Sequence, residues 1–324
     1  MVTALVTGIT GQDGGYLTEQ LVGEGAQVHG LVHEGDPGLA DFRRRHPDVP
    51  LHGGDLADHA GLRRVVDEVA PDELYNLAGI SSVAYSWHEP VRTAELSGLA
   101  AAVLMEAALS LQDRLGRPVA VVQASSAEIF GEAAAAPQDE TTPVRPVNPY
   151  GAAKAYAHHM VAVLRGKGLP ASSCILFNHE SPRRPETFVT RKITAGAARV
   201  ARQGGTLRLG NLDARRDWGW APDYVDAMVR AARHPGGGDF VIATGQTHTV
   251  ADFAEAALRR AGLGGSWREH VEVDPELFRP LDASVLVGDA SKARRELGWT
   301  PTVGFDELVG RMVDHDVALL AETP

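Results

Sequence analysis

The sequence predicts an α/β protein whose core is a doubly wound parallel sheet. Strand-length apolar runs alternate with helical patterns through the first half of the chain, and a glycine-rich segment follows the first of these runs. Such alternation is typical of parallel strands with helices on both faces of the sheet. The length of 324 residues is enough to bury a full core and suggests one large domain or two smaller ones.

The expected elements follow in order along the chain. Strands are expected at residues 3–7, 27–32, 74–77, 119–123 and 240–243. Helices are expected at residues 16–24, 60–69 and 99–111, and a further helix continues from Tyr150. The pattern loosens after about residue 178, where glycines interrupt shorter elements. The sequence therefore predicts a smaller, mixed α/β C-terminal region, with ligands bound between it and the sheet.

Charge and composition argue against several classes of protein. The chain has 31 Lys and Arg against 42 Asp and Glu, and its net charge of −11 disfavours general binding to nucleic acid or to anionic membranes. The single cysteine, Cys174, excludes a disulfide within the chain and a multi-cysteine metal site, so no metal is expected. No signal peptide is expected, and the apolar stretch 98–109, broken by Glu106, is too short to span a bilayer. We therefore expect a soluble, cytoplasmic protein.

Gly8, Gly11 and Gly14 form a G-x-x-G-x-x-G pattern between the first expected strand and a helix. Glycines at such a turn let the backbone approach a pyrophosphate, whose charge is favoured at a helix N-terminus. Glycine often only closes a turn, but a strand before and a helix after the pattern favour dinucleotide binding and a Rossmann-type sheet. Asp55 and Leu56, after a further apolar stretch, are candidates for contacting the adenine, the alternative being a turn at a strand end.

The choice between NAD and NADP depends on the residues that follow the second strand. A 2′-phosphate favours Arg or Lys there, whereas an acidic residue favours a ribose with a free hydroxyl. The strand runs into His33 and Glu34, so the local sequence favours NAD. The next arginines, Arg43, Arg44 and Arg45, are more typical of a solvated helix face than of a phosphate site.

Tyr150 and Lys154 stand four residues apart and would share one face of a helix. Tyrosine has a pKa of about 10, and a neighbouring ammonium stabilises the phenolate, so Tyr150 could act as a base near neutral pH. The spacing also occurs by chance, with a tyrosine packed beside a solvent-directed lysine. Following a dinucleotide loop and a serine-rich strand end, the catalytic interpretation is the stronger one.

That serine-rich strand end is SSAEIFG, residues 125–131. The hydroxyl of Ser126 could hydrogen-bond the substrate oxygen that Tyr150 deprotonates. Alcohol oxidation needs no second base, so Glu128 indicates a further proton abstraction, for example beside a newly formed ketone. The alternative is a carboxylate stabilised by a helix N-terminus, and from the residues alone the two interpretations are equal.

A family resemblance becomes specific over nearly the whole chain. The segments that carry it are TGITGQDG, YNLAG, SSAEIFG, YGAAK, FNHESPRRPETFVTRKI, GNLDARRDWG and FRPLDASVLVGDASKA. They resemble the GDP-mannose 4,6-dehydratase family of extended short-chain dehydrogenases/reductases. The resemblance implies that Tyr150, assisted by Lys154 and Ser126, takes the C4 hydroxyl proton as hydride passes to a nicotinamide. Glu128 then removes the C5 proton, water leaves from C6, and hydride returns to C6, giving GDP-4-keto-6-deoxymannose.

The resemblance also implies the residues that bind each ligand. Contacts to the cofactor, NADP in this family, would come from Gly8, Thr10, Gly11, Gln12, Asp13, Gly14, His33, Asp55, Leu56, Leu77, Ala78, Tyr150, Lys154, His179 and Arg184. Contacts to the GDP-sugar would come from Ser81, Ser126, Asn178, Val189, Lys192, Leu209, Asn211, Arg216, Arg279 and Asp282. Residues 183–217 hold nine Arg or Lys against three Asp or Glu, which agrees with a bound diphosphate, although a solvated helix face explains part of this excess.

The chain departs from the family pattern beside the expected sugar. Ala127 stands where relatives have Ser and where related dTDP-glucose dehydratases have an Asp that protonates the leaving hydroxyl. Ile80 and Ser82 stand where Gln and His are usual, and Pro185 replaces a glycine. These differences leave two alternatives to GDP-mannose dehydration, a GDP-sugar epimerase or a dehydratase of a modified substrate such as a GDP-heptose. A sugar-nucleotide-binding protein without catalysis is less favoured.

Two further expectations concern the cofactor and the assembly. His33 and Glu34 replace an arginine pair that binds the NADP phosphate in relatives, so NAD is the alternative to NADP. We expect a homodimer through the Tyr150 helix, with a tetramer as the alternative. The dinucleotide-binding domain is expected at residues 1–178, with 213–247 returning to it, and the sugar-nucleotide-binding region at 179–212 and 248–324.

Overall fold

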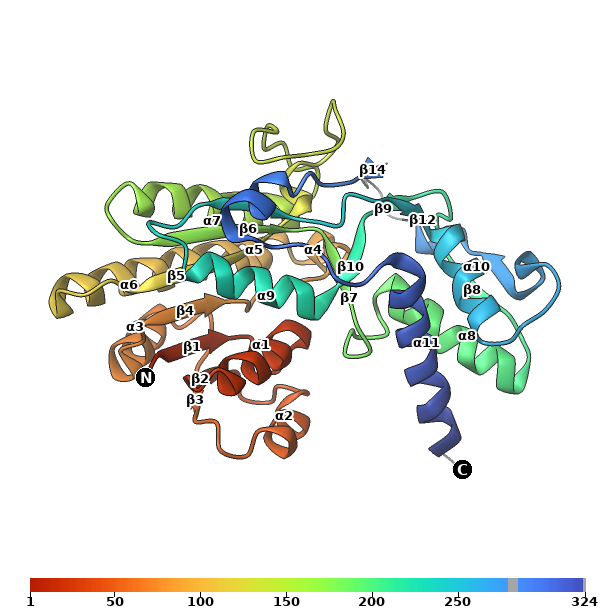
Figure 1. Cartoon of the computed structure of the whole chain (residues 1–324), viewed down its shortest axis with the longest axis horizontal. Coiled ribbons are helices and arrows are strands. Elements are labelled where there is room, and N and C mark those ends of the chain that lie inside the picture. The colour runs from red at the N-terminus through yellow and green to blue at the C-terminus, as the bar shows by residue number, and fades with distance from the viewer. Residues whose placement is uncertain (279–284, 323–324) are drawn as a thin grey trace.

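The computed structural model describes residues 1–278 and 285–322, and its larger part is built on one seven-stranded sheet (Figure 1). All strands of this sheet are parallel, in the order β11-β6-β5-β4-β1-β2-β3. Their bounds are β1 Thr3–Thr7, β2 Gln27–Val32, β3 Leu51–Gly53, β4 Glu73–Asn76, β5 Ala120–Ser126, β6 Ala171–Leu176 and β11 Asp239–Ile242. The strand order reverses between β1 and β4, which confirms the predicted doubly wound α/β class.

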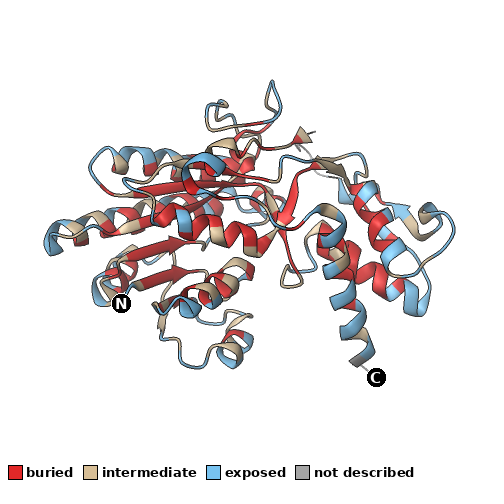
Figure 2. Ribbon diagram, viewed as in Figure 1, coloured by how far each residue is buried: buried red, intermediate tan, exposed pale blue. Residues whose placement is uncertain are grey.

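Helices cover both faces of this sheet. On one face lie α1 (Gln12–Gly23), α2 (Leu39–Arg45) and α9 (Ala221–Ala232), and on the other lie α3 (His59–Val69), α6 (Ala100–Leu115) and α7 (Pro149–Arg165). The short helices α4 (Val83–His88) and α5 (Pro90–Ala94) and a π-helical turn, Glu95–Leu99, lead from β4 into α6. Figure 2 shows that the strands are buried and that the helices bury the sides facing them.

A smaller region lies beyond the carboxyl ends of the sheet strands. Its helices α8 (Val189–Gln203), α10 (Val250–Arg260) and α11 (Phe305–Glu322) surround a core of their own, which includes Trp218 and Phe253. Its short strands pair as β7 with β10, β8 with β13, and β9 between β12 and β14. Their bounds are β7 Asn178–Glu180, β8 Leu207–Leu209, β9 Arg215–Arg216, β10 Trp218–Trp220, β12 His248–Thr249, β13 Val271–Val273 and β14 Val285–Leu286.

Several elements differ from the sequence expectation in their bounds. Helix α1 begins at Gln12 rather than at residue 16. The sequence expectation missed the first turn because that turn is polar and glycine-rich and shows no amphipathic pattern. Helix α6 runs past residue 111 to Leu115 and ends at Gly116, which has a positive φ of 64°. Strands β3 and β6 were not expected from the sequence, β3 because it has three residues and β6 because its Ala-Ser-Ser start lacks a strand pattern.

In the part of the chain that the structure describes, one helical stretch, Pro90–Leu115, is long and apolar enough to cross a membrane by composition alone. It is longer than the apolar stretch 98–109 because α5, the π-helical turn and α6 run on from one another. Of the 18 consecutive residues that are most apolar in this stretch, 56% are buried inside the protein, where α6 packs against α3 and α7. Its apolar character is therefore accounted for by a core helix.

Candidate active site

The glycine-rich turn predicted from the sequence joins β1 to α1. Gly8 has a positive φ of 68°, and a Cβ there would meet the backbone nitrogen of Ala78 at 2.9 Å. A Cβ on Gly14 would lie 2.4 Å from the carbonyl oxygen of Gly8. Helix α1 begins after Gly11, which supplies no side-chain cap, so the backbone N–H groups of the first turn are available to an anion. The turn therefore fits the pyrophosphate of a dinucleotide.

A cavity of about 500 Å³ lies at this turn. The sequence-predicted cofactor residues that line it are Gly8, Thr10, Gly11, Gln12, Asp13, Gly14, His33, Asp55, Leu56, Leu77, Ala78 and Arg184. It is also lined by residues that the sequence did not single out, chiefly Asp36, Arg92, Leu96 and Phe188. The predicted set is thus brought together from four strand ends and one distant loop.

The end of this cavity beside β2 is acidic. The carboxylate of Asp36 accepts hydrogen bonds from the Thr10 hydroxyl at 2.7 Å and from the Gly38 N–H at 2.8 Å. The carboxylate of Asp55 lies 3.7 Å from Nε2 of His33. Two carboxylates therefore face the region where a dinucleotide places its adenosine ribose.

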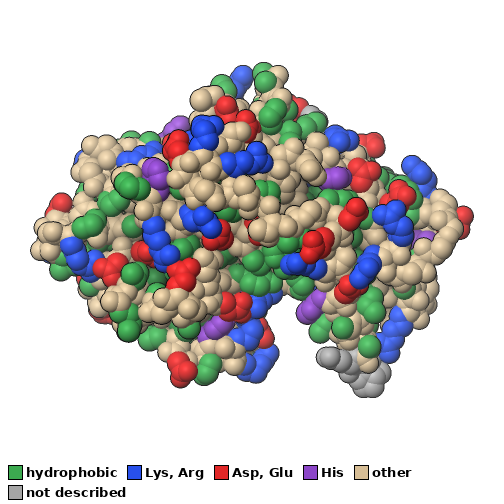
Figure 3. All heavy atoms as spheres, viewed as in Figure 1, with side chains coloured by type: hydrophobic (Ala, Val, Ile, Leu, Met, Phe, Trp, Pro, Cys, Tyr) green, Lys and Arg blue, Asp and Glu red, His purple; other side chains and the backbone are tan. Residues whose placement is uncertain are grey.

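The arginines of α2 do not balance these carboxylates. Arg44 and Arg45 form ion pairs with Asp41 on their own helix, and neither they nor Arg43 line the cavity. Figure 3 shows Lys and Arg side chains gathered on the outer surface over α2. Their arrangement agrees with the solvated helix face that the sequence favoured.

A second cavity, of about 310 Å³, adjoins the first and shares Asp13, Leu77, Ser81, Arg184 and Phe188 with it. The other sequence-predicted residues that line it are Ser126, Glu128, Tyr150, Lys154, Asn178, His179, Val189, Asn211 and Arg216. Lys192, half-buried on α8, and Leu209, buried in β8, are not among its lining residues. Arg279 and Asp282 lie outside the described residues.

Strand β5 brings Ser126 and Glu128 to this second cavity. The Ser126 hydroxyl oxygen accepts the N–H of Glu128 at 3.2 Å and so caps a short 3₁₀ turn, Ala127–Ile129. The carboxylate of Glu128 does not cap a helix but accepts a hydrogen bond from the side-chain amide of Asn148 at 2.8 Å. The glutamate therefore lines the cavity and also contacts the cap of α7, and its catalytic role stays a prediction. Asn148, which precedes the predicted Tyr150, was not expected here.

Helix α7 places Tyr150 and Lys154 on its buried face, as their spacing predicts. The ammonium of Lys154 donates to the carbonyl oxygen of Ala124 at 2.8 Å and lies 5.9 Å from the centre of the Tyr150 ring. Burial raises the pKa of Tyr150 to about 12, although a hydrogen bond with Ser126 lowers it. Burial also lowers the pKa of Lys154 to about 8, although the charge of the Asp13 carboxylate raises it. Burial is therefore the largest cause of both pKa shifts.

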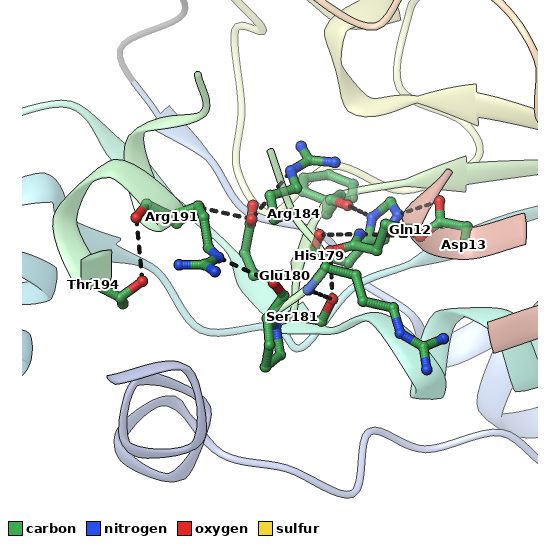
Figure 4. A network of polar contacts seen from close by, with 12 residues as sticks. Gln12, Asp13, His179, Glu180, Ser181, Arg184, Arg191 and Thr194 are labelled. Carbon is green, nitrogen blue, oxygen red and sulfur yellow. Dashed lines mark hydrogen bonds and ion pairs between the residues drawn. The ribbon is translucent and has the colours of Figure 1, made fainter. Parts of the chain in front are cut away.

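A His179–Asp13 pair, of which the histidine is buried and the aspartate partly buried, is drawn in Figure 4. Asp13 lines both cavities and His179 lines the second. Nε2 of His179 lies 2.9 Å from the Asp13 carboxylate, and Nδ1 lies 2.7 Å from the carbonyl oxygen of Phe177. Because a carbonyl only accepts, Nδ1 carries a proton, and Nε2 and Asp13 share a second one. Burial alone would lower the pKa of His179 and raise that of Asp13, but their attraction outweighs it, so the histidine pKa is raised and the aspartate pKa is lowered.

These shifts predict how the pair contributes to folding stability with pH. The raised pKa of His179 stabilises the fold below its unfolded value of about 6.5, and this contribution is lost as the pH rises through the folded pKa. The lowered pKa of Asp13 stabilises the fold above about 3.8, and this contribution is lost in acid. We expect His179→Gln to reduce the free energy of unfolding more at about pH 5.5 than at about pH 8.5, as urea denaturation can measure. An equal loss at both values would contradict the ion pair.

Arg184 belongs to both cavities, and its orientation is fixed by neighbours. Its guanidinium stacks on Phe188 at 3.8 Å, and its Nε lies 3.2 Å from the carboxylate of Glu180. The same carboxylate accepts the Thr190 hydroxyl at 2.7 Å, which ties it to the first turn of α8. A guanidinium held in this way presents its remaining N–H groups to a phosphate.

The positions that depart from the family pattern also lie at these cavities. Ala127 is 2% exposed and lines the second cavity with a methyl group, which donates no proton. Ser82 lines the second cavity, and Ile80 and Pro185 line the first. Trp218 lines the second cavity as well, with an indole N–H that has no hydrogen-bond partner among the described residues. It stands in the segment GNLDARRDWG, but nothing in its spacing indicates a role in the site.

A family model described as GDP-mannose 4,6 dehydratase matches residues 5–312 of this chain. Curated relatives agree over nearly their full lengths. GDP-mannose 4,6 dehydratase 1 of Arabidopsis thaliana is 46% identical and covers 98% of this chain and 90% of its own. The GDP-mannose 4,6 dehydratase of Homo sapiens is 41% identical, with 99% and 93% covered, and that of Vibrio cholerae is 40% identical, with 97% and 93% covered.

Solved structures support the same assignment of the fold. A UDP-glucose 4-epimerase of Thermus thermophilus, solved in complex with NAD, is 29% identical and superposes with a TM-score of 0.84, covering 97% of this chain and 98% of its own. A UDP-glucose 4-epimerase of Thermotoga maritima, solved with UDP-glucose, has a TM-score of 0.87 at 23% identity, with 98% and 99% covered, and shows the fold alone. By the match of the family model and the identity to curated relatives, the chain belongs to the GDP-mannose 4,6-dehydratase family.

Proposed function

We propose that this protein converts GDP-mannose to GDP-4-keto-6-deoxymannose by removing water across C5 and C6. The observation that carries the proposal is that Tyr150, Lys154 and Glu128 line one cavity, which adjoins the cavity at the glycine-rich turn. Oxidation of an alcohol uses the tyrosine and the lysine alone. A second base such as Glu128 is needed only when a proton beside the new carbonyl is also removed. Family membership supports GDP-mannose as the substrate.

The residues of the second cavity divide the proton transfers between them. A nicotinamide dinucleotide, when bound, supplies the hydride acceptor for C4 and the hydride donor for C6. Tyr150 takes the proton of the C4 hydroxyl, Ser126 hydrogen-bonds the same oxygen, and Lys154 supplies positive charge beside the phenol. Glu128 takes the proton at C5, which the C4 ketone has acidified. Because Ala127 offers only a methyl group, Glu128 also returns a proton to the leaving C6 hydroxyl.

The GDP part of the substrate would lie across the smaller region. Arg184 and Arg216 are the cations of the second cavity that are suited to the diphosphate of the substrate. Asn178, Val189 and Asn211 line the same cavity. Lys192, Leu209, Arg279 and Asp282 stay proposals from the resemblance. We also propose that residues 1–178 with 213–247 form the dinucleotide-binding domain, from which Arg216 reaches the sugar nucleotide, and that 179–212 with 248–324 form the sugar-nucleotide-binding region.

The cofactor that the acidic end of the first cavity favours is NAD. A 2′-phosphate on the ribose would face the carboxylates of Asp36 and Asp55, which line the same cavity, and repulsion between like charges about 5–15 Å apart near a protein surface costs of the order of 1–3 kcal/mol. Of the two arginines that line this cavity in the described part of the chain, Arg184 is shared with the second cavity and Arg92 belongs to α5, which packs against α7. We therefore expect binding of NAD at least about tenfold tighter than binding of NADP.

Replacing Asp36 tests this preference. Asp36→Ser keeps a hydroxyl for Thr10 and removes the charge, so the preference for NAD should shrink by about tenfold as NADP binding improves. Calorimetry of both dinucleotides with cofactor-free protein measures it. Asp113→Ser, at an exposed position on α6, is the matched control and should leave the ratio unchanged. Tighter binding of NADP to the unmodified protein would refute the proposal.

The proposed homodimer would form through α5 and α7. Exposed apolar side chains gather on these helices and their neighbours, at Tyr85, Val91, Leu99, Tyr156 and Val163. A patch of exposed apolar side chains on helices that contact one another is typical of a surface that a second copy covers, and Val91, at 81% exposed, is the most exposed of these side chains. Val91→Arg is therefore expected to give monomers in sedimentation velocity. Val317→Arg, at a position 44% exposed on α11, should leave the assembly unchanged, and a tetramer would show as a doubled mass.

The proposed reaction can be tested with GDP-mannose in deuterated water, followed by mass spectrometry and NMR. Loss of water with deuterium at C5 is the expected result. Deuterium at C5 without loss of water would replace dehydration by epimerase chemistry. An unchanged substrate, under conditions where a control dehydratase turns it over, would refute GDP-mannose as the substrate and move the search to other GDP-sugars such as a GDP-heptose.

A further inference from the structure

Asn148 uses both ends of its side-chain amide. The residue precedes helix α7 and is 4% exposed. Its Oδ1 accepts the backbone N–H of Gly151 at 2.8 Å, which caps the helix. Its Nδ2 donates to Oε2 of Glu128 at 2.8 Å. The amide therefore joins the helix of Tyr150 to the carboxylate at the end of β5.

The direction of this amide is fixed by its partners. The backbone nitrogen of Gly151 can only donate, so the oxygen of the Asn148 amide must face it. The NH₂ group then faces Glu128, and rotating the amide by half a turn would set donor against donor and oxygen against oxygen. One oxygen of the Glu128 carboxylate thus faces a donor.

The backbone around the pair leaves little room for another arrangement. A Cβ on Gly151 would lie 2.5 Å from the carbonyl oxygen of Glu128, so the first turn of α7 packs directly on the glutamate backbone. The Ser126 hydroxyl oxygen accepts the Glu128 N–H from the other side. The carboxylate is therefore held both through its backbone and through Oε2, the oxygen that the Asn148 amide hydrogen-bonds.

We propose that Asn148 is a positioning residue that assigns different tasks to the two oxygens of Glu128. This inference rests on the proposed dehydration. Oε2 stays an acceptor for the amide, and Oε1 takes the proton from C5. The C5–H electrons form the C5–C6 double bond as the C6–O bond breaks, and Oε1 gives its proton to the departing oxygen, which leaves as water. The carboxylate is restored. The proton taken from C5 is the one given to the departing oxygen, so no further reactant is needed, although Ala127 supplies no acid.

Asn148→Asp tests the assignment with little change in shape. An aspartate can still cap α7 at the Gly151 N–H, but it sets a carboxylate against Oε2 of Glu128. Product formation should fall by about 10²-fold or more, with the KM for GDP-mannose nearly unchanged. Oxidation at C4 should continue, so reduced cofactor should accumulate in rapid-mixing absorbance measurements. Asp58→Asn, which makes the reverse exchange at the exposed cap of α3, is the control and should leave both readouts unchanged.

Two results would overturn the inference: a rate close to that of the unmodified protein, or an equal loss of C4 oxidation in a variant with unchanged thermal stability. The second would mean that Asn148 acts only through α7. Infrared spectra of the ligand-free protein, with Glu128→Gln to identify the carboxylate band, decide the contact without turnover. Asn148→Asp removes the N–H donor from Oε2 and should shift the Glu128 carboxylate band, and an unshifted band would refute the contact even if GDP-mannose is not the substrate.

Discussion

Replacing Glu128 with glutamine should stop dehydration while leaving oxidation at C4 intact. Glutamine has the same shape, and its side-chain oxygen can still accept the hydrogen bond from Asn148, so the site should keep its geometry. It cannot accept a proton from C5, however, and Ala127 offers no substitute. We expect product formation to fall by about 10³-fold, within the range that general base catalysis contributes. Tyr150 and Lys154 are unchanged, so the 4-keto sugar and reduced cofactor should accumulate together.

The measurement is product formation by mass spectrometry together with reduced cofactor by absorbance after a single addition of GDP-mannose. Glu255→Gln, on the exposed side of α10, makes the same exchange away from the site and should behave as the unmodified protein. If Glu128→Gln kept dehydrating at a comparable rate, another group would be removing the C5 proton. If it lost thermal stability instead of activity, the carboxylate would have the structural role that the sequence left open.

Much of the site could be predicted from the sequence because its chemistry lies in short segments. The glycines of the turn sit within seven consecutive residues, and Tyr150 and Lys154 share one helix turn, so spacing alone places them. The carboxyl ends of parallel neighbouring strands then bring these segments to one edge, since register pairs Asn76 of β4 with both Thr7 and Gln123. The family resemblance added the residues of the smaller region, most of which line the second cavity.

The remainder depends on contacts between residues distant in sequence. Asn148 has the pattern of an ordinary helix cap, and its second bond, to Glu128 twenty residues earlier, appears only in the folded chain. Asp36 belongs to a loop without strand or helix pattern, and only its bond to Thr10 places it at the cofactor cavity. The pKa of Tyr150 could not be inferred either, because a four-residue spacing gives the distance to Lys154 but not the burial that raises it.

The largest effect on cofactor binding is expected from a single methyl group at Gly14. A Cβ there would lie 2.4 Å from the Gly8 carbonyl oxygen and 2.5 Å from Cα of Ile9, and both are backbone atoms with no flexible end to move aside. The turn and α1 must separate, which costs about 1–3 kcal/mol of folding free energy as overpacking does. The same movement draws the α1 N-terminus away from Gly8, so Gly14→Ala should lose about 10²-fold or more in dinucleotide affinity.

Gly23→Ala is the matched control, because Gly23 ends the same helix and a Cβ there would meet nothing within 4 Å. Alanine favours a helix over glycine by about 0.5–1 kcal/mol, so this variant should be slightly more stable and should bind the dinucleotide normally. Calorimetric titration with NAD and urea unfolding of both variants give the two quantities. Normal affinity in Gly14→Ala would show that the pyrophosphate does not depend on the close packing of α1 against Gly8. A loss of affinity in both variants would attribute the effect to the helix as a whole, whereas the expected contrast locates the cofactor at the turn.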